Sequence, residues 1–248
     1  IGTIADKLKM FRLQTALKRK TLTEIFQEEE IPTQTYLEKN GFSKEIIQQF
    51  FRPFFAGIFL EPHLETSSRM FEFVYKMFGE GYASLPKSGI EAIPKQLLQN
   101  LERTEIRYNT KVKRVKNGEV LLENGDSIQS DSIIVATDAG SLIPNLSGEE
   151  RKWQSCDTLY FETNSRAIDK PLIGLVSNSD VLINNVFFHT SLQMETKHKG
   201  QLLSVTVVQK HDLTEEALVV RVEKELKAVC GIATSRFLKR LQQYLLLK

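Results

Sequence analysis

Side chains that commonly bind metals or act as nucleophiles are few in this chain of 248 residues. The histidines are His63, His189, His198 and His211, and the cysteines are Cys156 and Cys230. The histidine spacing is not that of a metal site, and neither cysteine lies in a local catalytic signature. The sequence also contains no G-x-S-x-G elbow and no P-loop. We therefore expect no metal site, assign no catalytic residue, and expect both cysteines to be buried apolar residues.

A glycine motif from Gly79 to Ser84 has the spacing of part of a dinucleotide-binding fingerprint. That fingerprint must follow a buried strand and open a helix, so that the helix N-terminus faces the pyrophosphate. Here the preceding residues, Arg69 to Phe78, have helical periodicity, and a loop containing Pro86 follows. The pattern therefore predicts the C-terminal end of a helix rather than a phosphate site.

Composition narrows the class of protein. The chain has 33 Lys+Arg and 31 Asp+Glu residues, so no global field attracts nucleic acid, and we expect no nucleic-acid partner. No apolar run reaches the ~20 residues that a membrane span needs. Two distant cysteines favour a reducing compartment, and we expect a cytoplasmic protein. The chain begins Ile-Gly-Thr without a signal peptide, which favours an interior piece of a longer protein.

The hydrophobic period changes from helical to alternating near Glu105. Helices are expected over residues 4–19, 33–41, 45–60, 67–77 and 90–101, and a last one follows a cap at Thr214. Ser43 can cap the third of these and Ser67 or Thr66 the fourth, and Pro53 is expected to kink or split the third. Strands are expected over 106–108, 111–115, 119–122, 132–137, 157–163, 172–176, 183–189 and 202–208, with hairpin turns at Asn117-Gly118 and Asn124-Gly125. In the first helix, Ile4, Leu8, Phe11 and Leu17 are expected to fall on one face. Residues 237–247 fit either a strand or a helix. The fold class is α+β, or mixed α/β.

Three segments, in a fixed order, carry more information than any single motif. The first is Arg52-Pro-Phe-Phe-Ala-Gly-Ile-Phe-Leu60, followed by Thr66-Ser-Ser-Arg-Met-Phe71. The second is Leu85 to Leu97, and the third extends from Asn109 to Ala139. Together they resemble the phytoene desaturase-like and protoporphyrinogen oxidase-like branch of the FAD-dependent amine oxidase superfamily. The resemblance covers about residues 20 to 210.

This resemblance implies an FAD cofactor and a Rossmann-like dinucleotide-binding domain. Members of the family also carry a strand–G-x-G-x-x-G–helix, which residues 1–248 lack, so we expect this chain alone to bind FAD weakly. The cofactor-binding residues that the resemblance implies are Pro86, Gly89, Val112, Thr137, Asp138 and Ala139. The Val112 backbone would pair with adenine, residues 137–139 would approach the diphosphate or ribityl chain, and Gly89 would approach the isoalloxazine ring. An ordinary strand, a strand end and helix punctuation are the respective alternatives.

A run of phenylalanines on two expected helices could line a pocket for a large apolar substrate. Phe51, Phe55 and Phe59 are the candidate substrate-binding residues, and plain core packing is the alternative. The basic N-terminal helix could contact a membrane surface as a peripheral anchor, or it could simply be solvated.

The expected organisation has three parts: a helical part of the substrate domain in residues 1–102, a partial FAD-binding segment in 103–150, and a substrate-domain sheet with a C-terminal helix in 151–248. The resemblance implies a flavin-dependent oxidoreductase, an oxidase or desaturase acting on a hydrophobic or amine substrate. A flavin-free module that binds an apolar ligand or a partner protein is the alternative. The sequence does not determine the oligomeric state.

Overall fold

A computed structural model describes residues 1–137, 139–143, 152–192 and 200–247. The chain divides into two compact units, and each is described by itself. Unit 1 combines Ile1–Ala92 with Trp153–Leu247, and unit 2 contains Ile93–Lys152. Helix α7 (Ala92–Gln99) begins at the end of the first segment of unit 1 and continues into unit 2. The domain boundary expected after residue 102 stays a prediction.

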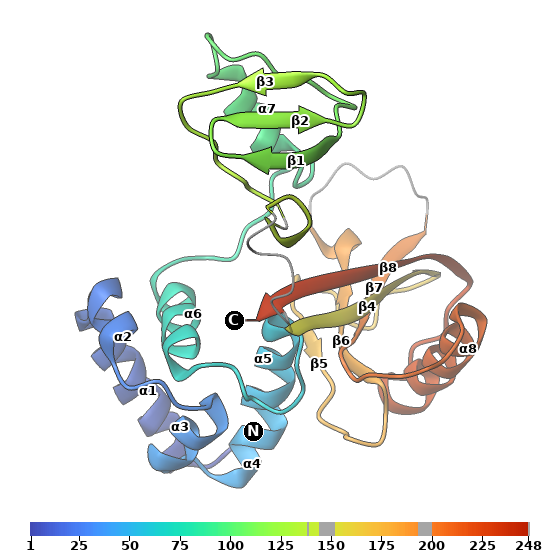
Figure 1. The fold of residues 1–248 in the computed structure, drawn as a ribbon. Coiled ribbons are helices and arrows are strands. Elements are labelled where there is room, and N and C mark those ends of the chain that lie inside the picture. The colour runs from blue at the N-terminus through green and yellow to red at the C-terminus, as the bar shows by residue number, and fades with distance from the viewer. Residues whose placement is uncertain (138, 144–151, 193–199, 248) are drawn as a thin grey trace. The chain divides into compact units, whose positions relative to one another are not determined.

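The first part of unit 1 is helical (Figure 1). Its helices are α1 (Ile4–Arg19), α2 (Leu22–Gln27), α3 (Thr33–Lys39), α4 (Lys44–Ile46), α5 (Arg52–Phe59) and α6 (Ser68–Glu80). The expected caps Ser43 and Ser67 are confirmed, since each side-chain oxygen accepts a backbone N–H of its helix. Gly81 ends α6, so the glycine motif is the end of a helix, as expected.

The packed face of α1 differs in part from the expected one. Ile4, Leu8 and Phe11 are 79%, 56% and 67% exposed, whereas Leu17 is buried together with Leu13. The cause is Asp6, whose carboxylate accepts the Ser43 N–H at 2.9 Å and the Ser43 hydroxyl at 2.7 Å. This contact turns the Asp6 side of α1 towards the start of α4, and the apolar stripe of the first turns is left outside.

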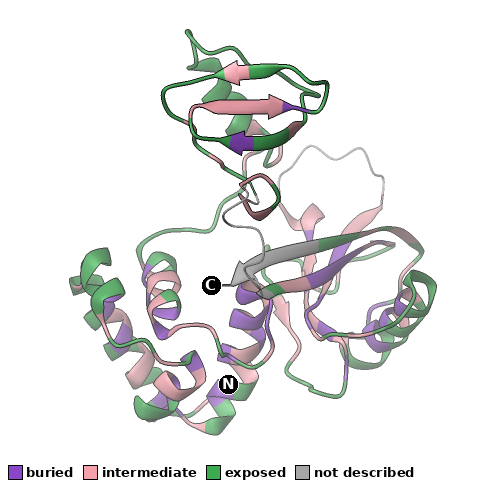
Figure 2. Ribbon diagram, viewed as in Figure 1, coloured by how far each residue is buried: buried purple, intermediate pink, exposed green. Residues whose placement is uncertain are grey.

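Helices α4 and α5 are joined by a π-helical turn, Ile47–Phe51. The Arg52 N–H donates to the Ile47 C=O, five residues earlier, immediately before Pro53. Because Pro53 has no N–H to continue the regular ladder, the expected disruption of this helix takes the form of a wider turn. Figure 2 shows that buried residues concentrate in α5 and in the strands of the second part of unit 1.

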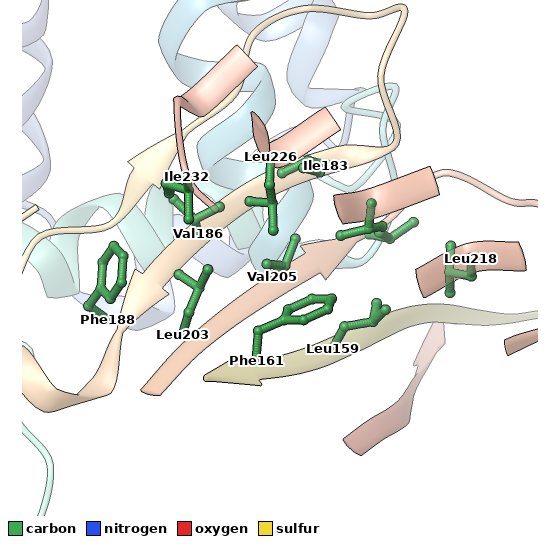
Figure 3. Close-up of a cluster of buried hydrophobic side chains, with 12 residues drawn as sticks. Leu159, Phe161, Ile183, Val186, Phe188, Leu203, Val205, Leu218, Leu226 and Ile232 are labelled. Atoms are coloured by element: carbon green, nitrogen blue, oxygen red, sulfur yellow. The ribbon is translucent and has the colours of Figure 1, made fainter. Parts of the chain in front are cut away.

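The second part of unit 1 is a sheet with the strand order β5-β6-β7-β4-β8. Its strands are β4 (Lys152–Thr163), β5 (Gly174–Leu175), β6 (Ile183–Phe188), β7 (Gln201–Val207) and β8 (Arg236–Leu247). Helix α8 (Glu215–Glu225), capped by Thr214 as expected, packs on one face. Leu218 and Leu226 meet Leu159, Phe161 and Val205 in this core (Figure 3). Alternation along each strand therefore directs the intervening residues to the opposite face.

Unit 2 contains α7 and a small antiparallel sheet, β1-β2-β3. The strands are β1 (Val112–Lys116), β2 (Glu119–Leu122) and β3 (Ser127–Gln129), and both Asn-Gly turns are confirmed. The strands expected at 106–108 and 132–137 do not form, and Ile134 is 94% exposed. An apolar run becomes a buried strand only beside a paired neighbour, and no described strand of unit 2 lies beside residues 132–137.

The α+β class is confirmed by these two units. Among the described helices, none has both the length and the apolar character required to cross a bilayer.

Candidate functional site

Val112 opens β1, which is an edge strand of the sheet in unit 2. It pairs with Leu122, whose N–H donates to the Asp126 C=O at 2.8 Å on the side away from β1. Residue pairs of an antiparallel ladder alternate between hydrogen-bonded and non-hydrogen-bonded pairs. Because the Leu122 N–H points away from β1, Val112 and Leu122 form a non-hydrogen-bonded pair, and the Val112 N–H and C=O point to the outer edge of the sheet. A register shift between Val112 and Arg114 gives β1 an extra residue, so Val115 faces the same edge. A ligand at this edge can therefore pair with the Val112 backbone.

The segment that includes Ala139 returns to this same edge. The Val115 N–H donates to the Leu142 C=O at 2.9 Å. The Ala139 C=O accepts the N–H groups of Leu142 and Ile143 at 3.1 and 2.8 Å, which closes a short 3-10 turn over Ala139–Ser141. Thr137 is exposed, and Asp138 lies outside the described residues. Unit 2 thus joins the Ala139 turn to the strand edge that carries Val112.

Pro86 and Gly89 belong to unit 1, and they form a tight turn by themselves. The Gly89 N–H donates to the Pro86 C=O at 2.9 Å, and the Gly89 C=O accepts the Ala92 N–H at 3.1 Å. Gly89 has a φ of +87°, which L side chains rarely adopt. A Cβ built there meets no atom within 4 Å, so the glycine is required by the backbone conformation and leaves open space beside it.

The three phenylalanines predicted to bind substrate are core residues. Phe51, Phe55 and Phe59 are 0%, 0% and 3% exposed, and Phe55 lies 4.7 Å from Phe71 between ring centroids. Side chains enclosed in this way cannot line a pocket, so the predicted substrate role is corrected to core packing. Their neighbours Phe50 and Phe54 are half-buried and stack at 5.5 Å, and Phe78 is 50% exposed.

A polar and aromatic cluster lies on the sheet face opposite α8. His189 follows β6, and its Nε2 is 3.0 Å from the hydroxyl oxygen of Ser204 on β7. The imidazole lies 5.1 Å edge-on from Phe187 and 5.7 Å from Tyr160 of β4. Ser204 stands directly opposite both Tyr160 and Phe187 in the strand register. We call His189, Ser204, Tyr160 and Phe187 the sheet-face cluster.

The hydrogen bond between His189 Nε2 and the Ser204 hydroxyl runs in a direction that depends on the tautomer of the imidazole. The Ser204 hydroxyl also lies 3.4 Å from the Phe187 C=O, which can accept its proton. The Nδ1 atom of His189 has no hydrogen-bond partner among the described residues. Burial lowers the pKa of His189, so the neutral imidazole is favoured. The half-buried ring therefore presents a nitrogen without a partner beside two aromatic rings, and this nitrogen is an acceptor in the tautomer that is protonated at Nε2.

No local motif in the sequence predicts this cluster. Alternation of side chains along a strand could place Tyr160 on one face of β4 and Ser204 on one face of β7. Their contact with each other and with His189 depends on the register between β4, β6 and β7, for which the sequence has no local signal.

Other reactive side chains have structural roles. Cys156 is buried and Cys230 is half-buried, and burial raises the pKa of both thiols, which keeps them unreactive. The Asp157 carboxylate accepts from His211 at 3.0 Å and from Arg240 at 2.7 Å, which ties β4 to β8 and to the segment before α8. Across the described ranges, no group of three or more His, Cys, Asp or Glu side chains is placed to hold a metal ion.

A model of the family described as flavin containing amine oxidoreductase matches residues 3–241. The chain belongs to this family. The resemblance to the amine oxidase superfamily and its flavin cofactor are thereby confirmed. None of the curated proteins compared with the chain matches it.

Solved structures agree with this family in fold. An oxidoreductase from Methanosarcina mazei has a TM-score of 0.73 at 13% identity, over 98% of this chain and 61% of that one. A protein from Pyrococcus furiosus has a TM-score of 0.65 at 15% identity, over 94% and 64%. A candidate protoporphyrinogen oxidase from Exiguobacterium sp. 255-15 has a TM-score of 0.61 at 17% identity, over 98% and 60%. This chain thus spans about three fifths of the length of each of these structures.

Each unit, taken by itself, has backbone features that suit part of a flavin nucleotide, and the expected cofactor contacts stay predictions. The outer edge of β1 at Val112 offers a backbone donor and acceptor in an orientation that a purine edge can match. The Gly89 turn has open space where a side chain would otherwise stand. The small side chain of Ala139 leaves the backbone of its turn accessible.

Proposed function

We propose that this chain forms the substrate-binding sheet and part of the FAD site of a flavin-dependent oxidoreductase acting on a hydrophobic or amine substrate. The observation that carries the proposal is the outward-facing backbone of Val112 in a chain of the flavin amine oxidoreductase family. When bound, flavin would supply the redox chemistry by accepting a hydride from a substrate C–H bond, as the adjacent C–C or C–N bond is oxidised to a double bond.

The proposed cofactor contacts use backbone more than side chains. The Val112 N–H and C=O pair with the adenine edge, while its apolar side chain packs on the purine face. Thr137 and Ala139 let the backbone approach the diphosphate or the ribityl chain. The Pro86–Gly89 turn approaches the isoalloxazine ring, since a positive φ at Gly89 presents its peptide without a side chain.

The proposed substrate contact is the sheet-face cluster. Tyr160 and Phe187 provide apolar ring surface, which suits a hydrophobic portion of a substrate. The neutral His189 provides an acceptor at Nδ1 for an N–H or O–H donor, and the Ser204 hydroxyl fixes the ring orientation. An amine with an adjacent apolar group satisfies both features. Two half-buried phenylalanines, Phe50 in the π-helical turn and Phe54 in α5, offer further apolar surface.

The cofactor proposal is tested by substitution at Val112 in the natural protein that contains this chain. Val112→Pro removes the outward N–H without breaking a β1–β2 hydrogen bond, because edge positions tolerate proline. Val112→Thr retains the N–H and serves as the matched control. We expect Val112→Pro to lower FAD content, measured as visible flavin absorbance per protein, and Val112→Thr to retain it. Equal flavin content in both variants would remove Val112 from the site.

The 248-residue chain is measured in the same way. Weak or no flavin absorbance is expected, since no glycine-rich phosphate turn is present in its sequence. If the natural protein also lacks flavin while binding a long-chain apolar probe, the alternative of a flavin-free binding module replaces the enzyme proposal.

Peripheral membrane contact is a separate proposal. Ile4, Leu8 and Phe11 form an exposed stripe on α1, and Lys7 and Lys18 are exposed on the same helix. Co-sedimentation with anionic vesicles that is lost in Leu8→Ser would support this contact, and unchanged co-sedimentation would remove the stripe as its cause.

A further inference from the structure

The backbone that carries His189 is a short turn beyond the end of a strand. This 3-10 turn, η4 (His189–Ser191), directly follows β6, and no side chain caps its start. The His189 C=O accepts the Leu192 N–H at 3.1 Å, which closes the turn. Carbonyl groups at the end of a helical turn have no partner inside it and need one from elsewhere. The place of the His189 side chain therefore depends on what holds η4 against the rest of unit 1.

One such partner is a side chain from the segment between β4 and β5. The Arg166 guanidinium donates from Nη1 to the Thr190 C=O at 2.6 Å, across 24 positions of sequence. A donor that carries a charge makes a stronger hydrogen bond than a neutral one, and a guanidinium keeps its charge at every physiological pH. Arg166 thus supplies a partner for the residue that directly follows His189.

The segment that carries Arg166 is itself anchored on both sides. Before Arg166, the buried Thr163 hydroxyl donates to the Ser165 C=O at 2.9 Å. After it, Ile168 packs against the hydrophobic core between the sheet and α8. The Asp169 carboxylate lies 3.8 Å from the Arg166 Nε atom and accompanies the guanidinium. Arg166 therefore reaches η4 from a segment that is held by the sheet and its core.

A second contact ties the turn to β7. The Thr190 hydroxyl donates to the Gln201 Oε1 atom at 2.7 Å. Gln201 begins β7, the strand that also carries Ser204. Thr190 is thus held by β7 through its hydroxyl and by Arg166 through its C=O. These two ties fix η4 at the residue next to His189, whose Nε2 atom lies 3.0 Å from the Ser204 hydroxyl oxygen.

We infer that Arg166 is a positioning residue for the sheet-face cluster: through the Thr190 C=O, it holds the His189 imidazole beside Ser204 and the two aromatic rings. The inference rests on the proposed function, since the cluster is the proposed substrate contact. Arg166 acts through the backbone of η4 and needs no contact with a ligand. Without its hydrogen bond, the turn keeps only the tie to β7, and the imidazole is free to move away from the rings and towards water.

The test uses the natural protein that contains this chain. Arg166→Met removes the donor and retains an unbranched side chain, whereas Arg166→Lys retains a cation that can donate to the same C=O. The ring C–H resonances of His189, assigned by their loss in His189→Gln, depend on the ring currents of Phe187 and Tyr160. At about pH 8, where the imidazole is neutral, a change in these resonances reports a change of position.

Arg166→Met should move the His189 resonances, and Arg166→Lys should restore most of their wild-type values. The pKa of His189, which burial lowers, should rise in Arg166→Met towards its ordinary value of about 6.5, because the imidazole gains access to water.

Arg221 provides a matched control on the other face of the sheet. It also donates to a backbone C=O, that of Asp180 at 3.3 Å, and it also pairs with a carboxylate, that of Glu225. It belongs to α8, which packs on the face opposite the sheet-face cluster. Arg221→Met should therefore leave the resonances and the pKa of His189 as they are in the wild type.

Binding of benzylamine, an amine beside an apolar ring, separates this inference from the proposed function. Isothermal titration calorimetry should show about tenfold weaker binding in both Arg166→Met and His189→Gln, since a misplaced or missing acceptor forfeits the hydrogen bond to the amine. If the His189 resonances move in Arg166→Met while benzylamine affinity changes in neither variant, Arg166 positions His189 and the substrate role of the cluster fails. The positioning role is overturned if Arg166→Met leaves the His189 resonances and pKa unchanged, or if Arg221→Met changes them equally.

Discussion

Gly57 of α5 lies so close to Asn185 of β6 that a Cβ on Gly57 would stand 3.1 Å from the Asn185 Oδ1 atom and 3.2 Å from the Asn184 Nδ2 atom. Asn184 also donates from Nδ2 to the Pro53 C=O at 2.9 Å. Helix α5 is therefore held against the sheet of unit 1 by a close backbone approach and an amide hydrogen bond. This contact joins the helical part of unit 1 to the sheet that carries the sheet-face cluster.

The first prediction concerns this approach. Gly57→Val should lower the free energy of unfolding by about 1–3 kcal/mol, because the larger side chain forces Asn184 and Asn185 to move. Gly81→Val is the control, since a Cβ at Gly81 meets no atom within 4 Å and its φ is not positive. Its effect should be within about 0.5 kcal/mol. Urea denaturation measures both, and equal losses would show that the α5–β6 approach is not tight.

The second prediction separates core phenylalanines from accessible ones. Phe55→Ala should cost about 3–5 kcal/mol of unfolding free energy, because Phe55 is fully enclosed. Phe54→Ala should cost less, since Phe54 is half-buried against Phe50 and Phe78. Ile134, which lies within the expected strand 132–137, is exposed, so Ile134→Ala should change stability by less than about 0.5 kcal/mol. A small loss in Phe55→Ala accompanied by altered binding of a long-chain apolar probe would restore the pocket interpretation.

What could be predicted from the sequence was largely local. The caps at Ser43 and Thr214 and the Asn117-Gly118 turn depend on residues within a few positions of each other, and all three were predicted correctly. The buried face of α1 was not, because it is decided by the contact between Asp6 and Ser43, which are far apart in sequence.

The candidate site shows the same limit. The contact of His189 with Ser204 depends on the register between strands, and the burial of Ile134 depends on whether a neighbouring strand pairs with its segment. Neither property can be predicted from a few consecutive residues. The adenine contact expected at Val112 stays a prediction, and the bulge that orients this strand edge has no sequence signal.

The third prediction compares two helix caps of the same type. Asp6 and Glu24 each complete a capping box, with Thr3 in α1 and with Thr21 in α2. Asp6 is buried and also accepts from Ser43, whereas Glu24 is exposed. Asp6→Asn should therefore cost about 2 kcal/mol, and Glu24→Gln less than about 1 kcal/mol, measured by urea denaturation at neutral pH. Equal costs would show that the Ser43 contact contributes nothing.

Asp6 also predicts a pH dependence. Burial by itself would raise the pKa of Asp6, but hydrogen bonds from Ser43 and Thr3 outweigh it and hold the pKa well below its usual value. Because the folded-state pKa is depressed, the stability that ionised Asp6 contributes is complete above about pH 4 and is lost as the pH falls through the folded pKa. The stability difference between wild type and Asp6→Asn should therefore shrink below about pH 4. A difference that stays constant into strong acid would contradict this.

The last prediction concerns His189 and a different pH range. Burial lowers its pKa, and the neighbouring Tyr160 stays neutral because burial raises the pKa of that phenol. Since the folded pKa of His189 lies below its unfolded value of about 6.5, its contribution to stability is complete above that pH and is lost as the pH falls through the folded pKa.

Wild-type stability should consequently fall between pH 7 and pH 5 by more than that of His189→Gln, because His189 takes up a proton more readily in the unfolded state and glutamine does not titrate. His63→Gln is the control, because His63 is exposed and this substitution should retain the wild-type pH profile. Urea denaturation across this range measures the slopes, and the ring C–H resonance lost in His189→Gln reports the titration directly. If all three proteins have parallel profiles, or if that resonance titrates above pH 6.5, then His189 is not the buried neutral acceptor that the proposed substrate contact requires.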